Sequence, residues 1–118
     1  MNMTIRKLFF LTMTVILSIV VCNCDKNNET LKELYIVYEN GEIEECKYKG
    51  KTVYCAGQNT YDAGAVVYDK DGKTIGSCSY AWGNVDAICD KLTDCKVIYR
   101  VKNNIWGEPA VDKYGLEK

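Results

Sequence analysis

The sequence predicts an α+β fold: a small antiparallel sheet built from two β-hairpins and a C-terminal strand, with one helix packed on it. Two short stretches place turn residues between alternating strands, and a third has apolar residues at helical spacing. The chain also carries seven cysteines in only 118 residues. A chain of this size buries a limited core, so the cysteines are expected to stabilise it as disulfides.

Residues 1–24 are expected to form a signal peptide. Arg6 and Lys7 precede an uncharged run from Leu8 to Val21. This run is too short to cross a bilayer as a helix, because about 20 residues are needed to span about 30 Å of hydrocarbon. Charged sequence begins immediately afterwards, which favours a cleaved signal over an uncleaved anchor or a buried core helix.

The exit of this segment, IVVCNCDKNNE, resembles the lipoproteins of Gram-negative bacteria, whose signal ends at a cysteine. In that family the cysteine sulfur carries a diacylglycerol group and the freed amine is acylated. The resemblance implies lipidation at Cys24, with Cys22 as the alternative because bulky Val21 directly precedes it. Several acyl chains would hold the domain stably on a membrane. The alternative is a secreted soluble protein cut near Cys24.

Residues 25–30 are polar and are predicted to be a tether to one small domain, residues 31–104. Without Arg6 and Lys7, the 15 basic residues of the chain become 13, against 16 acidic ones, a net charge of −3. Nucleic-acid binding depends on patches with an excess of Lys and Arg, so nucleic acid is not an expected partner. The expected partners are a membrane, through the lipid anchor, and a protein or envelope polymer.

The first element of the domain is predicted to be a short helix that starts at Glu29. Apolar residues occur at Leu31, Leu34, Ile36 and Tyr38, where spacings of three fit a helix and spacings of two fit a strand. Thr30 as an N-cap and neighbouring Lys and Glu residues favour the helix.

The stretch CKYKGKTVYC, residues 46–55, predicts the first hairpin. Gly50-Lys51 fits a type II′ turn, which prefers glycine first. In that register Cys46 lies opposite Cys55, with their Cα atoms about 4.5 Å apart, within the disulfide range. The sequence therefore predicts a Cys46–Cys55 disulfide. One face of this hairpin is expected to carry Cys46, Tyr48, Val53 and Cys55, and the other Lys47, Lys49, Thr52 and Tyr54.

The stretch AVVYDKDGKTIGSC predicts the second hairpin, with strands at about 65–69 and 73–78 around a type I turn and Gly72 in the left-handed position. DKDG also fits the start of a calcium-binding EF-hand loop. Lys73, Thr74 and Tyr80 occupy positions where that loop needs other residues, so a turn is favoured over a calcium site.

The stretch GNVDAICDKLTDC, residues 83–95, predicts the longest helix. Val85, Ile88, Cys89 and Leu92 have helical spacing, and Asn84 is available as the N-cap.

KVIYRV, residues 96–101, alternates as a strand. Residues 105–118 contain the only proline and are expected to form an irregular tail.

Three further cysteines remain to be paired: Cys78, Cys89 and Cys95. Cys78 leaves a strand and Cys89 faces inward from the predicted helix, so a Cys78–Cys89 bond is favoured over Cys89–Cys95. Cys95 would then be a buried free thiol or a bond to another chain. Because no two cysteines have C-x-x-C spacing, a redox motif is not expected, and a four-cysteine zinc site is the weaker alternative.

No catalytic residue, cofactor or metal is expected. The chain contains no histidine, which removes the usual general base and the commonest metal ligand. Acidic groups occur at Glu42, Glu44 and Glu45, and at Asp69 and Asp71. Each group falls on a predicted turn or exposed strand, so solvated charges are favoured over an acid–base pair.

Exposed aromatic residues provide the candidate binding positions. Without residues 1–24, the chain has nine Tyr and two Trp but no Phe. Tyr and Trp combine apolar area with a polar tip, which suits binding surfaces. Tyr80 and Trp82, in the loop SYAWGN, are therefore candidate ligand contacts, and packing over a small core is the alternative.

YKGKTVY and VYDKDGKTI, residues 48–54 and 67–75, resemble a group of small exported bacterial lipoproteins of uncharacterised function. This resemblance implies export and a small β-rich fold, without a reaction. A likeness to Kazal protease inhibitors fails because Ala65 replaces a required cysteine.

The sequence therefore predicts a non-catalytic, tethered binding or structural module of the cell envelope. The alternatives are an inhibitor of an external hydrolase such as a protease or lysozyme, with a protruding stapled loop, and an enzyme, which would need a pocket of converging side chains.

Overall fold

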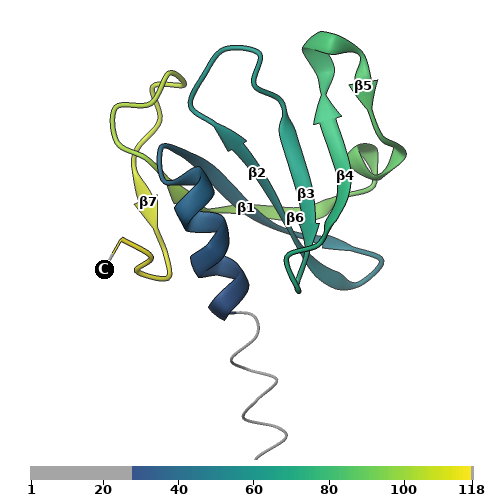
Figure 1. The fold of residues 1–118 in the computed structure, drawn as a ribbon, viewed down its shortest axis with the longest axis horizontal. Helices are drawn as coiled ribbons and strands as arrows, with labels where there is room; N and C mark the ends of the chain where they lie inside the picture. Colours follow the sequence, from purple (N-terminus) through teal and green to yellow (C-terminus); the bar gives the residue numbers. More distant parts are fainter. Residues whose placement is uncertain (1–27, 118) are drawn as a thin grey trace, which may run out of the picture.

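The computed structural model describes residues 28–117, which form one helix and a single antiparallel sheet (Figure 1). The helix covers residues 28–38. Two short 3₁₀ turns, η1 (Tyr80–Trp82) and η2 (Ala87–Asp90), lie in the connection between β4 and β6. The strands are β1 (Gly41–Tyr48), β2 (Lys51–Gln58), β3 (Ala65–Asp69), β4 (Thr74–Ser79), β5 (Asn84–Val85), β6 (Thr93–Arg100) and β7 (Val111–Asp112). Cys22, Cys24 and the predicted signal peptide lie outside the described residues.

The strands follow the spatial order β5-β4-β3-β2-β1-β6-β7. β1 with β2 and β3 with β4 form the two predicted hairpins, and the later strand β6 returns beside β1. The predicted fold class is therefore confirmed: one helix packs on an antiparallel sheet held by two disulfides. The tail was predicted to be irregular, but β7 pairs with β6 and extends the sheet.

The predicted first helix is confirmed, and its described part covers residues 28–38, including residues 28–30 of the segment assigned to the tether. Leu31, Leu34 and Tyr38 face the sheet, while Ile36 is 72% exposed on the outer side. Thr30 is not an N-cap. It lies inside the helix, and its hydroxyl donates to the carbonyl oxygen of Lys70 at 2.7 Å, joining the helix to the β3–β4 turn.

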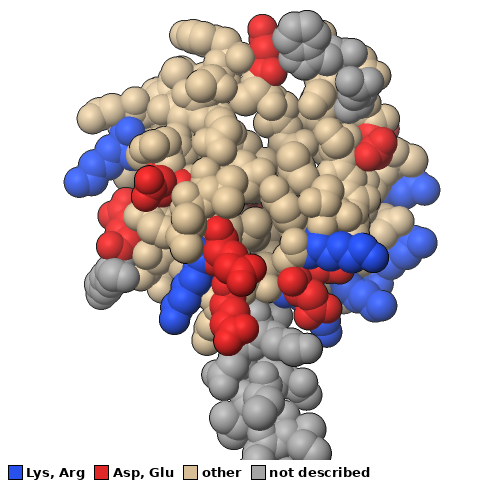
Figure 2. Space-filling model, in the orientation of Figure 1, with Lys and Arg blue, Asp and Glu red and all other residues tan. Residues whose placement is uncertain are grey.

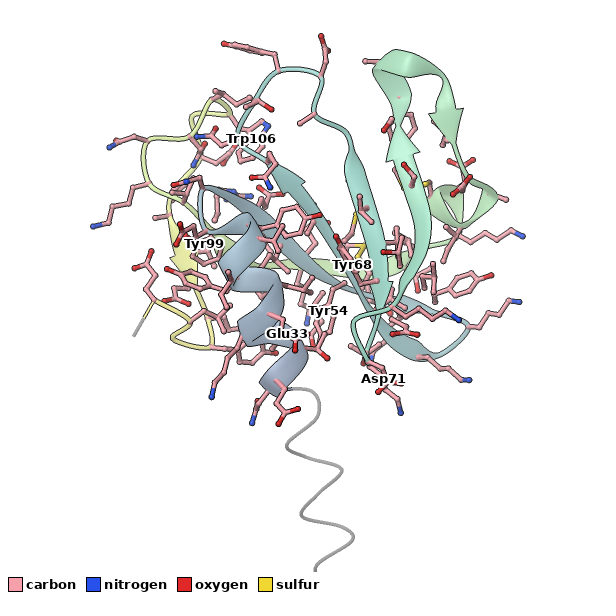
Figure 3. The ribbon with its side chains drawn as sticks, in the orientation of Figure 1. Glu33, Tyr54, Tyr68, Asp71, Tyr99 and Trp106 are labelled. Atoms are coloured by element: carbon pink, nitrogen blue, oxygen red, sulfur yellow. A yellow bond between two sulfur atoms is a disulfide. The ribbon has the colours of Figure 1, made fainter. Side chains whose placement is uncertain are left out.

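The helix covers the main core of the domain. Tyr99 of β6 meets Tyr35 edge to face with ring centroids 5.1 Å apart, and the hydroxyls of Tyr38 and Tyr68 are hydrogen bonded at 2.7 Å. Burial raises the pKa of Tyr54 and of Tyr99 to about 12. The residues buried in this cluster are Leu31, Leu34, Tyr38, Ile43, Tyr54, Ala56, Ile98 and Tyr99. Figure 3 shows Tyr54, Tyr68 and Tyr99 gathered between the helix and the sheet.

The β1–β2 hairpin forms, but its register differs from the prediction. Tyr48 pairs with Lys51 and Cys46 with Val53, so the turn residues are Lys49 and Gly50. Both have positive φ, 51° and 76°, as a type I′ turn requires. Relative to the predicted register, β2 is displaced by two residues along β1. Since strand side chains alternate with a period of two, the strand residues keep their predicted faces. Lys49 is the exception, because it was predicted on a strand face and lies in the turn.

The predicted Cys46–Cys55 disulfide is wrong. Cys46 is bonded to Cys95 of β6, with Cα atoms 4.1 Å apart, and Cys55 is free. In the observed register Cys55 lies opposite Glu44, one diagonal away from Cys46. The return of β6 beside β1 places Cys95 next to Cys46, at a bulge where Asp94 has a positive φ of 51°.

The predicted helix over residues 83–95 is also wrong. Val85 pairs with Cys78 in a short β-ladder, and Asp86 is extended. The Asp86 carboxylate accepts a hydrogen bond from the backbone N–H of Ser77 at 2.8 Å, and its own N–H donates to the Ser77 carbonyl oxygen. These bonds hold the segment against β4, so only the single turn η2 remains helical.

The segment from β5 to η2 covers the second face of the sheet. The predicted Cys78–Cys89 disulfide is confirmed and closes this segment onto β4. Ile88 packs over Gly76, where an added Cβ would lie 2.4 Å from the Ile88 side chain. This second core comprises Cys46, Val53, Val67, Cys78 and Ile88.

The predicted β3–β4 hairpin is confirmed. Its turn carries Gly72 with φ 86°, and the Asp69 carboxylate accepts hydrogen bonds from the N–H groups of Asp71 and Lys73. Asp69 therefore caps the turn, as an Asx residue commonly does.

Candidate binding cleft

A cleft of about 700 Å³ opens at the end of the sheet where β2 runs into β3. Its floor comes from β1, β2 and β6, and its rim comes from the β2–β3 loop (residues 59–64), η1 and the loop of residues 101–110. We call this site the acidic cleft. Its charged side chains are Glu42, Glu44, Asp62, Arg100 and Glu108.

Glycines allow the floor and the rim to approach closely. A Cβ on Gly57 would lie 2.8 Å from the carbonyl oxygen of Gly64. A Cβ on Gly64, which has φ +70°, would lie 2.6 Å from the Ser79 hydroxyl. Any larger residue at either position would push the strands apart, so these glycines fix the shape of the cleft.

An ion pair forms one wall of the acidic cleft. Glu42 and Arg100 pair across β1 and β6, and Arg100 Nε donates to Glu42 Oε2 at 2.7 Å. Their side chains are only 20% and 15% exposed. The Arg100 guanidinium also donates to the Pro109 carbonyl oxygen at 3.3 Å. Such a partly buried, multiply bonded pair is held more firmly than a surface salt bridge.

Glu44 lies two residues along β1 from Glu42, on the same face of the strand. Burial raises the pKa of Glu44, and a hydrogen bond and the negative charge of Glu42 raise it further, while Arg100 lowers it. The sequence predicted solvated charges here, but both glutamates are partly buried. The return of β6, which supplies Arg100, encloses them.

Cys55 lies at the base of the cleft, opposite Glu44. Burial, together with the charges of Glu44 and Glu42, raises the pKa of the Cys55 thiol to about 11. The thiol is therefore protonated at neutral pH. Because the thiolate is the nucleophile, Cys55 is poorly suited to covalent catalysis.

Two aromatic side chains lie on the rim. Tyr80 of η1 is 67% exposed and Trp106 is 41% exposed, and both line the cleft. Figure 3 shows Trp106 near the end of the molecule where the β2–β3 loop lies. Tyr80 was predicted from the sequence as a candidate contact. The other candidate, Trp82, has a side chain outside the described part of the structure.

The rim is held by hydrogen bonds of two asparagines. Asn104 is buried, and its side-chain amide donates to the carbonyl oxygens of Val101 and Glu108, both at 2.9 Å. Its Oδ1 accepts from the Glu108 N–H at 3.1 Å. Asn59 in the β2–β3 loop accepts from the Ile105 N–H at 2.7 Å, which joins the two loops. Trp106 therefore sits on a loop that is fixed before any ligand arrives.

Sequence reasoning missed Glu42, Glu44, Arg100 and Trp106 as a group. They come from β1, β6 and the tail, and only the pairing of β6 with β1 brings them together. The pattern of charged residues along β1 or β6 does not predict that these two strands pair. Trp106 was the only available hint, as an aromatic residue in a polar tail.

One group of three metal-ligating side chains occurs in the described part of the chain: Glu44, Cys46 and Cys95. The two sulfurs are bonded to each other, so neither is a thiolate while the disulfide lasts. Zinc and other soft metals bind cysteine as the thiolate. In the oxidised protein, only the Glu44 carboxylate of this group can therefore coordinate a metal ion.

Glu44→Gln is expected to stabilise the domain at neutral pH. The folded-state pKa of Glu44 is raised, so its contribution to stability is present below the unfolded pKa and is lost as the pH rises through the folded pKa. Glutamine resembles the protonated carboxyl at every pH. Allowing for the partial exposure of Glu44, the gain at pH 7 is about 0.5 kcal/mol, or a rise in Tm of about 2–4 °C.

Thermal unfolding of wild type and variant at pH 3 and pH 7 measures this difference. The two proteins should have the same Tm at pH 3. Glu33→Gln, an exposed glutamate on the helix, is the matched control and should leave Tm unchanged at both pH values. An equal gain at pH 3 would show that the charge of Glu44 is not the cause.

The disulfides indicate an oxidising compartment outside the cytoplasm. None of the helices formed by residues 28–117 has the length and apolar character to span a membrane. No protein-family model matches the chain, and no curated protein or solved structure matches it.

Proposed function

We propose that this protein is a non-catalytic binding module tethered in the cell envelope, and that the acidic cleft holds its ligand. The observation that carries the proposal is a cleft with two exposed aromatic side chains, Tyr80 and Trp106, beside four carboxylates. Binding sites in proteins are commonly concave and preformed, with a few polar groups that set orientation.

The chemistry of the cleft favours binding over catalysis. Glu42 is already paired with Arg100, and burial raises the pKa of Glu44. The Cys55 thiol is protonated, and the chain has no histidine to act as a base.

The cleft is suited to a ligand that presents hydrogen-bond donors. Its charged lining comprises four carboxylates and one guanidinium, and that guanidinium already donates to Glu42 and Pro109. Aromatic rings contribute stacking area and attract cations over their faces. An amine-bearing or polyhydroxylated component of the envelope has these properties.

The tether is proposed from the sequence. The predicted signal peptide and the lipoprotein-like exit at Cys24, or alternatively Cys22, place a lipid anchor just before the described domain. Two disulfides in the domain support export. Intact mass spectrometry of the native protein would test the anchor, because it measures the mature N-terminus and any lipid mass.

Binding can be tested with the Tyr80→Ala/Trp106→Ala variant. Wild type and variant would be titrated with soluble muropeptides, envelope oligosaccharides and amine-bearing peptides by calorimetry. We expect one ligand class to bind wild type and to bind the variant about 10- to 100-fold more weakly, because each ring contributes about 1 kcal/mol or more. Tm should not change, since both rings are exposed.

Tyr114→Ala is the matched control. Tyr114 is 46% exposed and contacts Glu45, on the other face of β1 from the acidic cleft. This variant should bind as wild type does. A ligand that binds all three proteins equally would place recognition elsewhere on the molecule.

A hydrolase inhibitor is the second candidate, favoured by one observation. The Cys78–Cys89 disulfide closes the loop that carries exposed Tyr80 at its base, as a rigid inhibitory loop requires. Assays of lysozymes and extracellular proteases with micromolar protein would test it. Inhibition lost in Tyr80→Ala and retained in Trp106→Ala would favour the inhibitor over the cleft.

A further inference from the structure

The β1–β2 turn is a concentrated positive tip. Lys47, Lys49 and Lys51 fall within five residues, and the chain has no acidic residue from Cys46 to Tyr61. Lys49 and Gly50 form the turn itself, so the neighbouring side chains project from the end of the hairpin. Lys49 and Lys51 are both exposed.

The β3–β4 turn lies beside this tip. Residues of both turns line a shallow hollow of about 600 Å³, among them Lys49, Lys51 and Lys70 with Tyr48 and Ile75. We call these five residues the lysine end. Figure 2 shows basic side chains gathered at the lower right of the viewed face, over these two turns.

Acidic groups lie near the lysine end but leave the tip positive. Asp69 and Asp71 also line the hollow. The Asp69 carboxylate accepts hydrogen bonds from the backbone of its own turn and keeps its charge. The hollow is lined by three lysines and two aspartates, which leaves it with a net positive charge. Asp71 lies at the tip of the β3–β4 turn (Figure 3), and it also lines a smaller hollow with Glu29 and Glu33 of the helix.

The described chain starts at this same end. The helix is described from residue 28, and Thr30 in its first described turn donates to the carbonyl oxygen of Lys70. Three residues lie between Cys24 and residue 28, so four Cα–Cα steps separate the two, and an extended chain spans at most about 3.5 Å per step. A lipid on Cys24 would therefore hold the start of the helix within about 14 Å of the membrane surface.

We propose that the lysine end is a docking surface for anionic lipid headgroups, which orients the domain on its membrane. This inference rests on the proposed tether. Lysines near an anionic bilayer contribute about 1 kcal/mol each, equivalent to about fivefold in partitioning. Tyr48 and the partly exposed Ile75 add an aromatic and an apolar side chain suited to the interface.

The orientation has a direct consequence for the acidic cleft. β2 runs from Lys51 at the lysine end to Gln58 at the cleft, and eight residues of strand cover about 25 Å. In Figure 1 the β2–β3 loop and the start of the helix lie at opposite ends of the molecule. A domain docked by its lysine end presents the cleft away from the bilayer.

Lysine acetylation on vesicles tests the proposal with the full exported protein. The protein would be bound to vesicles of phosphatidylcholine alone or with 30% phosphatidylglycerol, and the acetylation rate of each lysine read by mass spectrometry. Lys49, Lys51 and Lys70 should react at least fivefold more slowly on the anionic vesicles. Lys102 and Lys113 should react at equal rates, and 0.5 M NaCl should abolish the difference.

A second measurement compares variants with equal charge. Protein that intact mass shows to carry no lipid would be sedimented with the anionic vesicles. Lys49→Gln/Lys51→Gln/Lys70→Gln should partition about 100-fold more weakly than wild type. Lys91→Gln/Lys96→Gln/Lys102→Gln, the matched control with exposed lysines outside the lysine end, should lose less than about fivefold.

Equal acetylation of the lysine end on both vesicles, or equal losses in the two triple variants, would overturn the docking surface. That result would leave the proposed ligand binding by the acidic cleft unaffected, because the Tyr80→Ala/Trp106→Ala variant tests it separately. Lysine-dependent partitioning by the protein without lipid would support the docking surface, while the lipid mass of the native protein separately decides the tether.

Discussion

Replacing Cys46 and Cys95 together by alanine is expected to lower the free energy of unfolding by about 4 kcal/mol. The bond joins residues 49 apart in sequence, so its loss returns a large loop-closure entropy to the unfolded chain. The Cys78–Cys89 bond closes a separation of 11 residues and should contribute about 3 kcal/mol. Urea unfolding at pH 7 measures both values.

Cys55→Ala is the control for this prediction. Cys55 is partly buried and has no covalent partner, so its truncation should cost less than about 1 kcal/mol. Peptide mapping after digestion at low pH would identify the bonded pairs directly. A Cys46–Cys55 peptide, with Cys55→Ala as costly as the loss of Cys46 and Cys95, would contradict the assigned pairing.

Tyr99→Ala is expected to destabilise the domain by about 4 kcal/mol. The ring is 1% exposed and packs against Tyr35 under the helix, so its removal leaves a large cavity. Its hydroxyl donates to the carbonyl oxygen of Glu39, at the end of the helix. Tyr99→Phe keeps the ring and loses only this hydrogen bond, so it should cost about 1 kcal/mol.

Urea midpoints of the two variants separate packing from hydrogen bonding. Tyr61→Ala is the control, because that ring is 83% exposed and should contribute less than about 0.5 kcal/mol. If Tyr99→Phe were as costly as Tyr99→Ala, the hydroxyl would be the main contribution, and the packing under the helix would be far looser than the structure shows.

The local pattern of turn residues and apolar residues predicted the hairpins and the first helix. The turn residues at Gly72 and the spacing of Leu31, Leu34 and Tyr38 are determined within a few neighbouring residues, so sequence reasoning reaches them. Except for Lys49, the faces of the first hairpin were also predicted correctly. A shift of two residues preserves the faces, so alternation alone could not reveal the error in register.

The disulfide error follows from that same limit. The choice between Gly50-Lys51 and Lys49-Gly50 as the turn decides whether Cys46 opposes Cys55 or Val53. The preference of a type II′ turn for glycine at its first central position favoured the wrong turn. The deciding contact is with Cys95 on β6, a non-local pairing that no residue of the hairpin indicates.

The predicted helix over residues 83–95 shows how tertiary contacts override helical periodicity. Ile88 and Cys89 face the sheet, as the spacing of apolar residues predicted. Their backbone is held by β4 through Asp86 and by the bond from Cys89 to Cys78. The pattern therefore identified the buried residues and assigned them the wrong backbone.

The acidic cleft could be predicted least well. Tyr80 was found because exposed aromatic residues in a loop stand out in any sequence. Glu42, Glu44 and Arg100 lie on separate strands and resemble ordinary surface charges until β6 returns beside β1. Fold class and faces are local properties, while this cleft depends on long-range topology.

The attachment of the first helix determines how the domain would respond to mechanical load. A pull on the chain at residue 28 acts first on the Thr30–Lys70 hydrogen bond and on the packing of Leu31 and Leu34. The crosslink from Cys46 to Cys95 lies deeper in the sheet and bears none of that initial force. Under tension the contacts of the helix would therefore yield before the covalently joined strands β1 and β6 separate.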